Sequence, residues 1–418
     1  MISLADSLDR IPVGGRIIAG AYCGGPTSLL RAIAERSPGR GWQLWTGLLL
    51  DDGGVYEAAS SADLRLATWH VAGAGRELAE RNLIDYLPVR ASQLEKRIAA
   101  WDLDAALVRV TPPDSDGWCS LGPSAGYALT AIKTAKLCIA EVDEALPRTC
   151  GQSRVHVSAL DVLVPSTTPT PVYRSPEPDD VSQAIARHVL TLLPDRPVLQ
   201  VGIGGATEAV VTALADERVD RLRFVGMGID AMVDLFERGV LDGGRLAIES
   251  PDLLGTQRLM RFAHENPVVG VFPSSVAHAP QWLAKHQRLV SLNSAVEIDL
   301  SGQVNSEVVA GRQIAGIGGS IDFVEAATHS AGGRRVIALP STTRDGRRSR
   351  IVPRLDATAI VTIPRGMVDF VVTEHGIAQL EGKTLRQRAE ALIDIAAPQH
   401  RQALVQALPQ ALRQPVSI

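Results

Sequence analysis

The feature that most constrains the fold is a recurrence: each half of the chain has a short apolar strand that runs into a glycine turn and then into helical spacing. In the first half these segments are residues 16–20, 23–26 and 28–34, and in the second half they are residues 198–202, 204–205 and 207–215. A strand that feeds a helix through a tight turn is typical of an α/β sheet with mainly parallel strands. The two occurrences therefore predict two similar open α/β domains, not a short-period repeat.

The boundary between the two domains is predicted near a Pro- and Thr-rich segment, residues 164–171, which has the composition of a linker. Further strands are expected at residues 106–110 and 137–142. A chain of 418 residues is too long for one ordinary core, so we expect a first domain over residues 1–175 and a second over residues 176–418. In such sheets ligands bind beyond the carboxyl ends of the strands, where the glycine turns lie.

Composition and charge exclude several classes of protein. The formal net charge is −4, which argues against a general nucleic-acid binder but not against an anionic ligand. The four cysteines form no C-x-x-C pair, so neither a disulfide framework nor a zinc site is expected, and a reducing cytoplasm fits best. No signal peptide and no apolar run of roughly 18 residues is found, so we expect no membrane span.

Two glycine loops are the candidate ligand sites. They contain Gly202, Gly204 and Gly205 in one loop and Gly316, Gly318 and Gly319 in the other. Glycines between a strand and a helix let backbone amides approach a ligand, and the helix N-terminus favours an anion or a developing oxyanion. The alternative is a tight turn without a ligand, which a short glycine pattern does not exclude by itself.

Other polar groups have both a functional and a structural interpretation. The run at residues 344–348 carries three arginines and is either a phosphate contact or a solvated hairpin, the usual outcome for a lone charge run. Cys119 lies in a loop and is a candidate nucleophile, although a structural thiol is the more common role. The histidines form no metal-binding pattern, and His375 is the one that we single out.

A set of separated segments carries a more specific signal, which is most extended at residues 291–307 (SLNSAVEIDLSGQVNSE). The others are residues 111–122, 139–142, 316–323, 332–334, 349–353 and 372–378. Together these segments resemble the acetyl-CoA hydrolase/transferase family, which includes 4-hydroxybutyrate and acetate CoA-transferases. The likeness extends over nearly the whole chain.

The resemblance implies two open α/β domains of the CoA-transferase type with the active site between them. It also implies an acyl-CoA substrate, a carboxylate that accepts CoA, a homo-oligomer and no metal. In the family a glutamate attacks the acyl thioester, a mixed anhydride forms, and CoA returns onto the glutamate carbonyl. In the matching motifs the residues expected to contact CoA are Asn293, Arg334 and Arg350, besides the six loop glycines.

The sequence departs from the family where the glutamate is expected. In the family it lies in a His-Ser/Thr-Glu-Met segment, a few residues before an Asp-Gly-x-x-Asp-Leu helix start. Aligning Met227, Asp230 and Asp234 with these positions places Gly226 at the glutamate and Phe224 at the histidine. Because glycine has no side chain, the glutamyl route cannot run through this position.

Three interpretations stay open at this point. The first is an acyl-CoA enzyme with another mechanism (hydrolysis, decarboxylation or another reaction of the acyl group) in which Glu208, Glu307, Glu374 or Asp230 supplies a carboxylate. The second is a true CoA-transferase whose glutamate comes from another position or from a partner subunit. The third is a catalytically inactive CoA-binding protein that regulates or scaffolds. The intact loop at residues 316–319 favours a working cleft.

Overall fold

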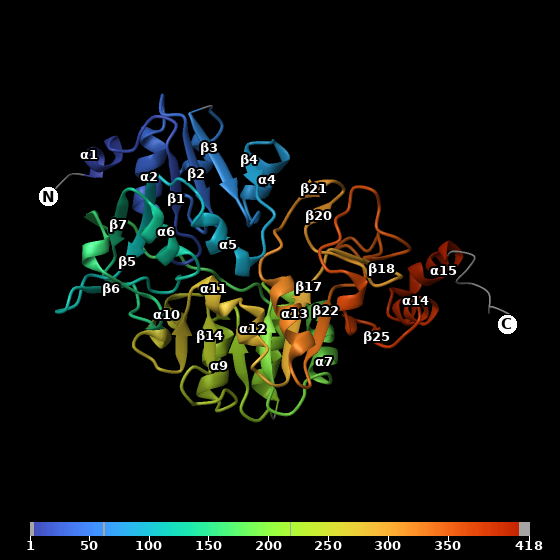
Figure 1. Cartoon of the computed structure of the whole chain (residues 1–418). Helices are drawn as coiled ribbons and strands as arrows, with labels where there is room; N and C mark the ends of the chain where they lie inside the picture. The colour runs from blue at the N-terminus through green and yellow to red at the C-terminus, as the bar shows by residue number, and fades with distance from the viewer. Residues whose placement is uncertain (1–3, 62, 218, 409–418) are drawn as a thin grey trace.

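A computed structural model describes residues 4–408 except 62 and 218, and arranges them around two large sheets (Figure 1). In the described part of the chain the first sheet has seven strands, in the order β10-β7-β5-β1-β2-β3-β4, and every pairing in it is parallel. Its strands are β1 (Arg16–Ala19), β2 (Trp42–Thr46), β3 (Leu64–Thr68), β4 (Ile84–Tyr86), β5 (Ala105–Val110), β7 (Cys138–Val142) and β10 (Val162–Pro165). The helices of this half are α1 (Leu4–Asp9), α2 (Thr27–Arg36), α3 (Val55–Ala58), α4 (Gly75–Glu80), α5 (Ala91–Ile98) and α6 (Ala128–Thr134).

The second sheet has nine strands among the described residues, in the order β25-β24-β22-β17-β11-β12-β14-β16-β8. They are β8 (Cys150–Gly151), β11 (Val198–Val201), β12 (Arg223–Val225), β14 (Ile248–Ser250), β16 (Val269–Val271), β17 (Leu289–Ser294), β22 (Arg334–Ala338), β24 (Phe370–Thr373) and β25 (Gly376–Gln379). The helices of this half are α7 (Asp180–Leu190), α8 (Gly205–Ala213), α9 (Ala231–Glu237), α10 (Gln257–Ala263), α11 (Ser274–Ala277), α12 (Pro280–Leu283) and α13 (Ser320–His329). The edge strand β25 is antiparallel to β24, and the other pairings are parallel.

The two sheets repeat one topology. In the first sheet, β1 lies at the centre, β2, β3 and β4 follow on one side, and β5, β7 and β10 follow on the other. In the second, β11 takes the central place, with β12, β14 and β16 on one side and β17, β22 and β24 on the other. The strand order therefore reverses between β1 and β5 and between β11 and β17, and such switch points are where open α/β sheets bind ligands.

Smaller elements complete the chain at its C-terminal end and between the sheets. They are β6 (Trp118–Ser120) with β9 (Arg154–His156), β13 (Gly228–Ile229) with β15 (Leu253–Leu254), β18 (Glu297–Asp299) between β19 (Val304–Asn305) and β23 (Ile351–Val352), β20 (Val308–Val309) with β21 (Arg312–Gln313), α14 (Leu385–Asp394), α15 (Pro398–Ala407), and the 3-10 turns 157–159, 214–216 and 365–367. Figure 1 shows the pair β20–β21 beside α4 and β4 of the first sheet. Arg312 of β21 forms an ion pair with Glu80 of α4, with 2.6 Å between the charged atoms.

The central strands form because their sequences are almost continuously apolar, as parallel strands covered on both faces require. All six residues of β5 are buried. One apolar cluster includes Ile18 and Val108 of the first sheet together with Leu199 and Phe224 of the second. The two halves therefore pack against each other through a shared core, and this packing fixes the space between the sheets.

The structure confirms the predicted fold class and the expected strands. The Pro- and Thr-rich segment differs from a free linker, because side chains of residues 166–170 are bonded into the first half. The strand β8 comes from the first half of the chain but pairs with β16 at the edge of the second sheet. The pairing of β8 with β16 thus ties the two halves together.

Candidate active site

A cavity of about 210 Å³ lies at the carboxyl ends of the central strands of the second sheet, where the first half covers them. From the second half it is lined by Gln200, Val201, Gly202, Ile203, Met227, Asp252, Ser274, His278, Asn293, Ser294, Ser306, residues 315–320 and Phe323. From the first half it is lined by Tyr22, Trp69, His70, Val89, Ala91, Leu94 and Tyr127. The cavity therefore stands at the switch point between β11 and β17, with one wall from each half of the chain.

The polar groups of the cavity lie at the carboxyl ends of neighbouring strands of the second sheet. Gln200 is the penultimate residue of β11, and its side-chain amide nitrogen donates to Oδ1 of Asn293 on β17 at 3.3 Å. Met227 follows β12, Asp252 follows β14, and Ser274 follows β16. Because the carboxyl ends of parallel strands meet at one edge, side chains that are far apart in sequence converge there.

The first half adds an aromatic wall with two polar tips. The hydroxyl of Tyr22 is 3.0 Å from Nδ1 of His70. The hydroxyl of Tyr127 donates to the carbonyl of Ala19 at 2.7 Å, and the Tyr127 ring packs edge-on against Trp69. The aromatic rings are thus held by the end of β1 and by the segment after β3.

The ionisable groups of the cavity are shifted toward their neutral forms. Burial raises the pKa of Asp252 to about 7, although the neighbouring Ser124 hydroxyl opposes the rise. Burial lowers the pKa of His70 and of His278 to about 4 each, and the charge of Arg76 adds to the effect at His70. None of the lining residues is a lysine or an arginine. At neutral pH the cavity therefore holds two uncharged imidazoles and one carboxyl group that is near its midpoint.

Gly226 lies beside this cavity, between β12 and Met227, and its backbone is in the left-handed region with φ of +90°. A Cβ atom built on it would lie 3.0 Å from the Phe323 ring and 3.3 Å from Cγ of Gln200. The space that a side chain would need is therefore filled, mainly by a ring that itself lines the cavity. Both the backbone conformation and the packing disfavour a glutamate here.

The first predicted glycine loop reaches the cavity only in part. Gly202 lines it, but the Gly202 amide already donates to the carbonyl of Leu292 at 2.9 Å. The Gly204 amide donates to Oε1 of Glu208 at 2.9 Å, and Gly205 begins α8. Neither Gly204 nor Gly205 is among the lining residues. This loop therefore shapes the floor of the cavity, and its amides at 202 and 204 are occupied.

The second predicted glycine loop does line the cavity, with Gly316, Gly318 and Gly319. A Cβ on Gly316 would lie 2.2 Å from the carbonyl oxygen of Trp69, and a Cβ on Gly319 would lie 2.4 Å from the His278 ring. Among the hydrogen bonds between described residues, none uses the amides of Gly318 and Gly319, which precede α13. These two amides, next to the N-terminus of a helix, are therefore available to a bound oxyanion.

Glu307 holds the second loop in place without lining the cavity. Its Oε2 accepts from the Tyr86 hydroxyl at 2.9 Å and its Oε1 from the Thr362 hydroxyl at 2.8 Å. The amide of Ile317 donates to the same Tyr86 oxygen at 3.2 Å. Glu307 thus acts on the loop through Tyr86, which belongs to the first sheet.

The other predicted carboxylates are engaged in local structure. Glu208 accepts from the Tyr173 hydroxyl at 2.9 Å in addition to the Gly204 amide. Glu374 accepts from the backbone amide and the hydroxyl of Ser341. Asp230 accepts from Thr256 and Leu259 near the start of α10. None of these carboxylates is among the residues that line the cavity.

The predicted arginine contacts also lie outside the cavity. Arg334 is the first residue of β22, at the amino end of the strand, and it donates to the carbonyl of Leu192. Arg350 donates to the carbonyls of Thr342 and Val296. The run 344–348 forms a turn closed by Thr343 and Arg348, as expected for a solvated hairpin. The structure thus brings Asn293 to the cavity and leaves Arg334 and Arg350 away from it.

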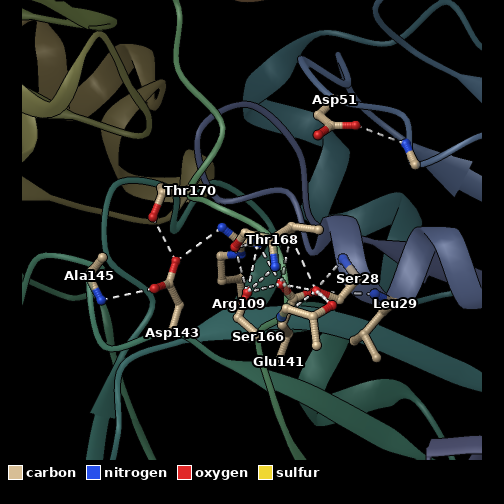
Figure 2. A network of polar contacts seen from close by, with 12 residues as sticks. Ser28, Leu29, Asp51, Arg109, Glu141, Asp143, Ala145, Ser166, Thr168 and Thr170 are labelled. Carbon is tan, nitrogen blue, oxygen red and sulfur yellow. Dashed lines mark hydrogen bonds and ion pairs between the residues drawn. The ribbon is translucent and has the colours of Figure 1, made fainter.

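In the first half, the corresponding switch point is filled by the protein itself (Figure 2). The Glu141 carboxylate accepts from the amides of Ser28 and Leu29, at 2.9 and 3.2 Å, at the start of α2. Figure 2 shows Arg109 between the carboxylates of Glu141 and Asp143, with nitrogen–oxygen distances of 2.5 and 3.0 Å. A protein carboxylate therefore occupies the helix N-terminus that an anionic ligand would need.

Sequence reasoning missed the four polar side chains that stand out in the cavity, which are Tyr22, His70, Asp252 and His278. A signal was present for Asp252, because it lies two residues after the carboxyl end of the buried strand β14. Cys119 is buried, and burial raises the pKa of its thiol, in keeping with a structural role. His375 lies next to Glu374, away from the cavity.

The described residues contain neither a cluster of metal-binding side chains nor a membrane-spanning helix. No group of three or more His, Cys, Asp or Glu side chains is placed to hold a metal ion within that part of the chain. Among the same residues, no helix is long and apolar enough to cross a membrane.

Comparison with known proteins places the chain. Residues 66–172 match the acetyl-CoA hydrolase/transferase N-terminal domain, and residues 255–408 match the C-terminal domain of the same family. The 4-hydroxybutyrate coenzyme A transferase of Clostridium kluyveri is 34% identical over 422 residues, which cover 97% of this chain and 96% of that protein. Gly226 and Asp252 lie between the two matched ranges.

Solved structures agree. RipA from Yersinia pestis superimposes with a TM-score of 0.89 and 28% identity, over 97% of this chain and 96% of that chain. A 4-hydroxybutyrate CoA-transferase from Porphyromonas gingivalis gives a TM-score of 0.78 at 28% identity, over 97% of this chain and 96% of that one. With the family models matching most of its length, the chain belongs to the acetyl-CoA hydrolase/transferase family and is a CoA-transferase-family enzyme that acts on acyl-CoA.

Proposed function

We propose that this protein cleaves acyl-CoA thioesters with water and does not pass CoA to a carboxylate through a glutamyl thioester. The observation that carries the proposal is Gly226. It stands where the family resemblance expects the glutamate, its φ is +90°, and the Phe323 ring fills the adjacent space. A nucleophile cannot act from this position, whereas the cavity beside it keeps the two amides of the second glycine loop.

The lining of the cavity supports a small, uncharged acyl group as the substrate. Aromatic and aliphatic side chains such as Trp69, Leu94 and Phe323 form most of the wall. No cationic side chain lines it, and the two imidazoles are neutral at pH 7. A carboxylate, either on the acyl chain or as an acceptor of CoA, would lose its hydration without gaining a partner. A water molecule carries no charge, so its entry into the cavity does not have this cost in hydration.

One observation favours a second candidate function. Asp252 places a carboxyl group on the cavity wall, one strand over from Gly226. A true CoA-transferase could use this group as a substitute nucleophile, because carboxylates form the acyl and CoA intermediates of this chemistry. The absence of a cation among the lining residues weighs against this candidate, because the acceptor would be anionic.

The proposal is tested by incubating the purified protein with acetyl-, butyryl-, succinyl- and malonyl-CoA, each with and without acetate, and identifying the products by mass spectrometry. Free CoA and the free acid, formed at the same rate with and without acetate, are expected for acetyl- and butyryl-CoA. Acetyl-CoA formed from butyryl-CoA and acetate would contradict the proposal in favour of transfer. Decarboxylation of malonyl-CoA without hydrolysis, or binding without turnover, would contradict it in favour of a different reaction or an inactive CoA-binding protein.

A further inference from the structure

Asp252 stands out because its side chain is not needed by the loop that carries it. The loop is held through its backbone: the carbonyl of Asp252 accepts from the Gly228 amide at 3.2 Å and from the Ser250 hydroxyl at 2.7 Å. The carbonyl of Pro251 accepts from the amides of Ala125 and Gly126. Among the described residues, no backbone amide donates to the Asp252 carboxylate. Apart from the Ser124 hydroxyl beside it, the carboxylate is therefore available to the cavity that it lines.

The neighbouring chain leaves room for this carboxylate. A Cβ on Gly126 would lie 3.1 Å from Oδ2 of Asp252 and 3.5 Å from the Ser274 hydroxyl oxygen. The glycine at position 126 therefore lets a carboxylate and a hydroxyl approach the same stretch of backbone. Asp252 itself is only 6% exposed, so what it can reach is the cavity and not bulk solvent.

An unpartnered polar group lies on the same wall. His278 is 6% exposed, and its Nδ1 is buried without a hydrogen-bond partner among the described residues. Unpartnered polar groups at this depth are rare in folded proteins, because each one loses its hydration. An unpartnered imidazole nitrogen and a carboxyl group in one cavity indicate a place where a polar reactant binds.

We infer that Asp252 is the general base of this site, and that it activates the water that attacks the thioester carbonyl of an acyl-CoA bound between the two sheets. The inference rests on the hydrolysis proposed above and assigns its catalytic residue. A carboxylate on the wall, with the free amides of Gly318 and Gly319 on the same cavity, supplies the base and the oxyanion donors that acyl transfer to water needs.

The proposed step needs only water, the thioester and the Asp252 carboxylate. A water proton passes to the Asp252 carboxylate while the water oxygen forms a bond to the acyl carbon. The carbon–sulfur bond then breaks with its electron pair on sulfur, and the proton held by Asp252 passes to the leaving CoA thiolate. The products are the free acid and CoA, and Asp252 returns to its carboxylate form.

The surroundings of Asp252 suit a base that works near neutral pH. The groups that face it from the first half are Tyr22, Cys23, Ser124 and Tyr127, all of them uncharged at neutral pH, and the same cavity holds the neutral imidazoles of His70 and His278. Burial raises the Asp252 pKa to about 7, whereas a carboxylate of ordinary pKa is a weak base toward water. We expect kcat/KM to fall about tenfold for each pH unit below this pKa and to level off above it.

The first test compares wild type with Asp252→Asn in butyryl-CoA hydrolysis. General-base removal is expected to lower kcat/KM by about 10²–10⁴-fold, with little change in the Kd of a non-hydrolysable thioether analogue of butyryl-CoA. The matched control is Asp195→Asn, which makes the same change at an exposed turn outside the cavity and should leave hydrolysis unaltered. Wild-type activity in Asp252→Asn would overturn the role of Asp252 alone. A wild type that hydrolyses none of the acyl-CoAs would overturn the proposed function together with it.

Two further measurements use the wild-type protein, so they stand even if Asp252→Asn does not fold. A kcat/KM that is flat between pH 5 and pH 9 would contradict the general base. A single turnover in ¹⁸O-water with excess enzyme should label the released acid and leave the peptide that contains Asp252 unlabelled. Label in the Asp252 side chain would instead mean that this carboxylate attacks the thioester itself, and the general-base role would be wrong.

Discussion

At the scale of single residues, two positions at the ends of neighbouring strands carry the proposed chemistry: Gly226 beside the cavity and Asp252 on its wall. Gly226 removes the nucleophile that the family resemblance leads one to expect, and its φ of +90° together with Phe323 closes the space. Asp252 brings a carboxyl group back, one strand over, on a loop whose backbone already satisfies the local hydrogen bonds. The proposed site thus has no side chain at one strand end and a carboxyl group at the next.

Gly226→Ala is expected to lower the free energy of unfolding by about 1–3 kcal/mol, because it strains a left-handed backbone position and presses on a buried ring. Urea unfolding measures the change. Gly243→Ala is the control, since no atom lies within 4 Å of its Cβ position, and it should change stability by less than about 0.5 kcal/mol.

Gly226→Glu is expected to give no transfer of CoA from butyryl-CoA to acetate, for the same two reasons. The double variant Gly226→Glu, Phe323→Ala makes room for the side chain but keeps the backbone strain. Trapping of a glutamyl-CoA thioester in the single variant, seen as a mass increase of the intact protein, would show that our account of this position is wrong.

Asp252→Asn should change how stability depends on pH. Above about pH 4 the aspartate is ionised in the unfolded chain, whereas in the folded protein burial keeps it protonated up to about pH 7. The folded state therefore binds the extra proton in this window, and the stabilisation that this group gives at low pH is lost as pH rises from about 4 to 7. Asparagine cannot ionise, so the variant should be more stable than wild type by about 4 kcal/mol at pH 8.

Thermal or urea unfolding at several pH values measures that difference. It should vanish below about pH 3, where both unfolded and folded wild type are protonated at Asp252. Because the two buried histidines titrate in both proteins, their contribution cancels in the difference. A difference that does not depend on pH would mean that Asp252 is not buried as a largely neutral acid.

At the scale of elements, the two halves use the same strand order but treat the helix after the central strand differently. In the first half, the N-terminus of α2 is closed by the Glu141 carboxylate, which Arg109 holds from β5. In the second half, the Gly204 amide ahead of α8 is taken by Glu208, and the free amides lie instead at the start of α13. The same strand order therefore gives a switch point filled by protein side chains in the first half and one with a cavity in the second half.

Glu141→Gln should lower the free energy of unfolding by about 3 kcal/mol, because it leaves the buried Arg109 guanidinium with one carboxylate and removes the anion at the start of α2. Denaturant unfolding measures the loss. The control is Asp9→Asn, which removes half-exposed ion pairs to Arg36 and Arg40 and should change stability by no more than about 1 kcal/mol. Equal effects of the two variants would contradict a special role for the buried network.

At the scale of the whole molecule, the cavity exists only because both halves close over it. Tyr22, Trp69 and His70 belong to the first half, and the strand ends that carry the polar groups belong to the second. The bond between Tyr86 and Glu307 ties the two halves beside the second glycine loop, and the bond of the Ile317 amide to the same hydroxyl sets the loop position. The position of the second glycine loop and the docking of the two halves are thus linked through one hydroxyl.

Tyr86→Phe removes that hydroxyl and should weaken both properties. We expect a loss of about 1–3 kcal/mol in the free energy of unfolding, because the buried Glu307 loses a donor, and a several-fold rise in the KM for butyryl-CoA. Tyr56→Phe, which changes a tyrosine of α3 away from the cavity, should leave KM unaltered. An unchanged KM in Tyr86→Phe would mean that the loop keeps its position without the bond.

The sequence alone determined the fold class, the main strands and the glycine loops, because apolar periodicity and turn residues act over a few neighbouring positions. It also pointed to Asn293 and Gly316–Gly319 at the cavity and, through the family motif, to Gly226. Those properties are local or carried by a contiguous motif, so they can be found without knowing which strands are neighbours.

Only the tertiary structure decided which polar groups meet. Asp252 and His70 come from strands of different sheets, and no spacing along the chain relates them. The sequence could not show either whether a helix N-terminus is free. The backbone amide of Ser28, at the start of α2, is bonded to Glu141, which lies 113 positions away. The physical reason is the same in both cases: burial and convergence at strand ends depend on strand order and on the packing of the two halves, and these set the pKa of a carboxyl group that sequence alone leaves ordinary.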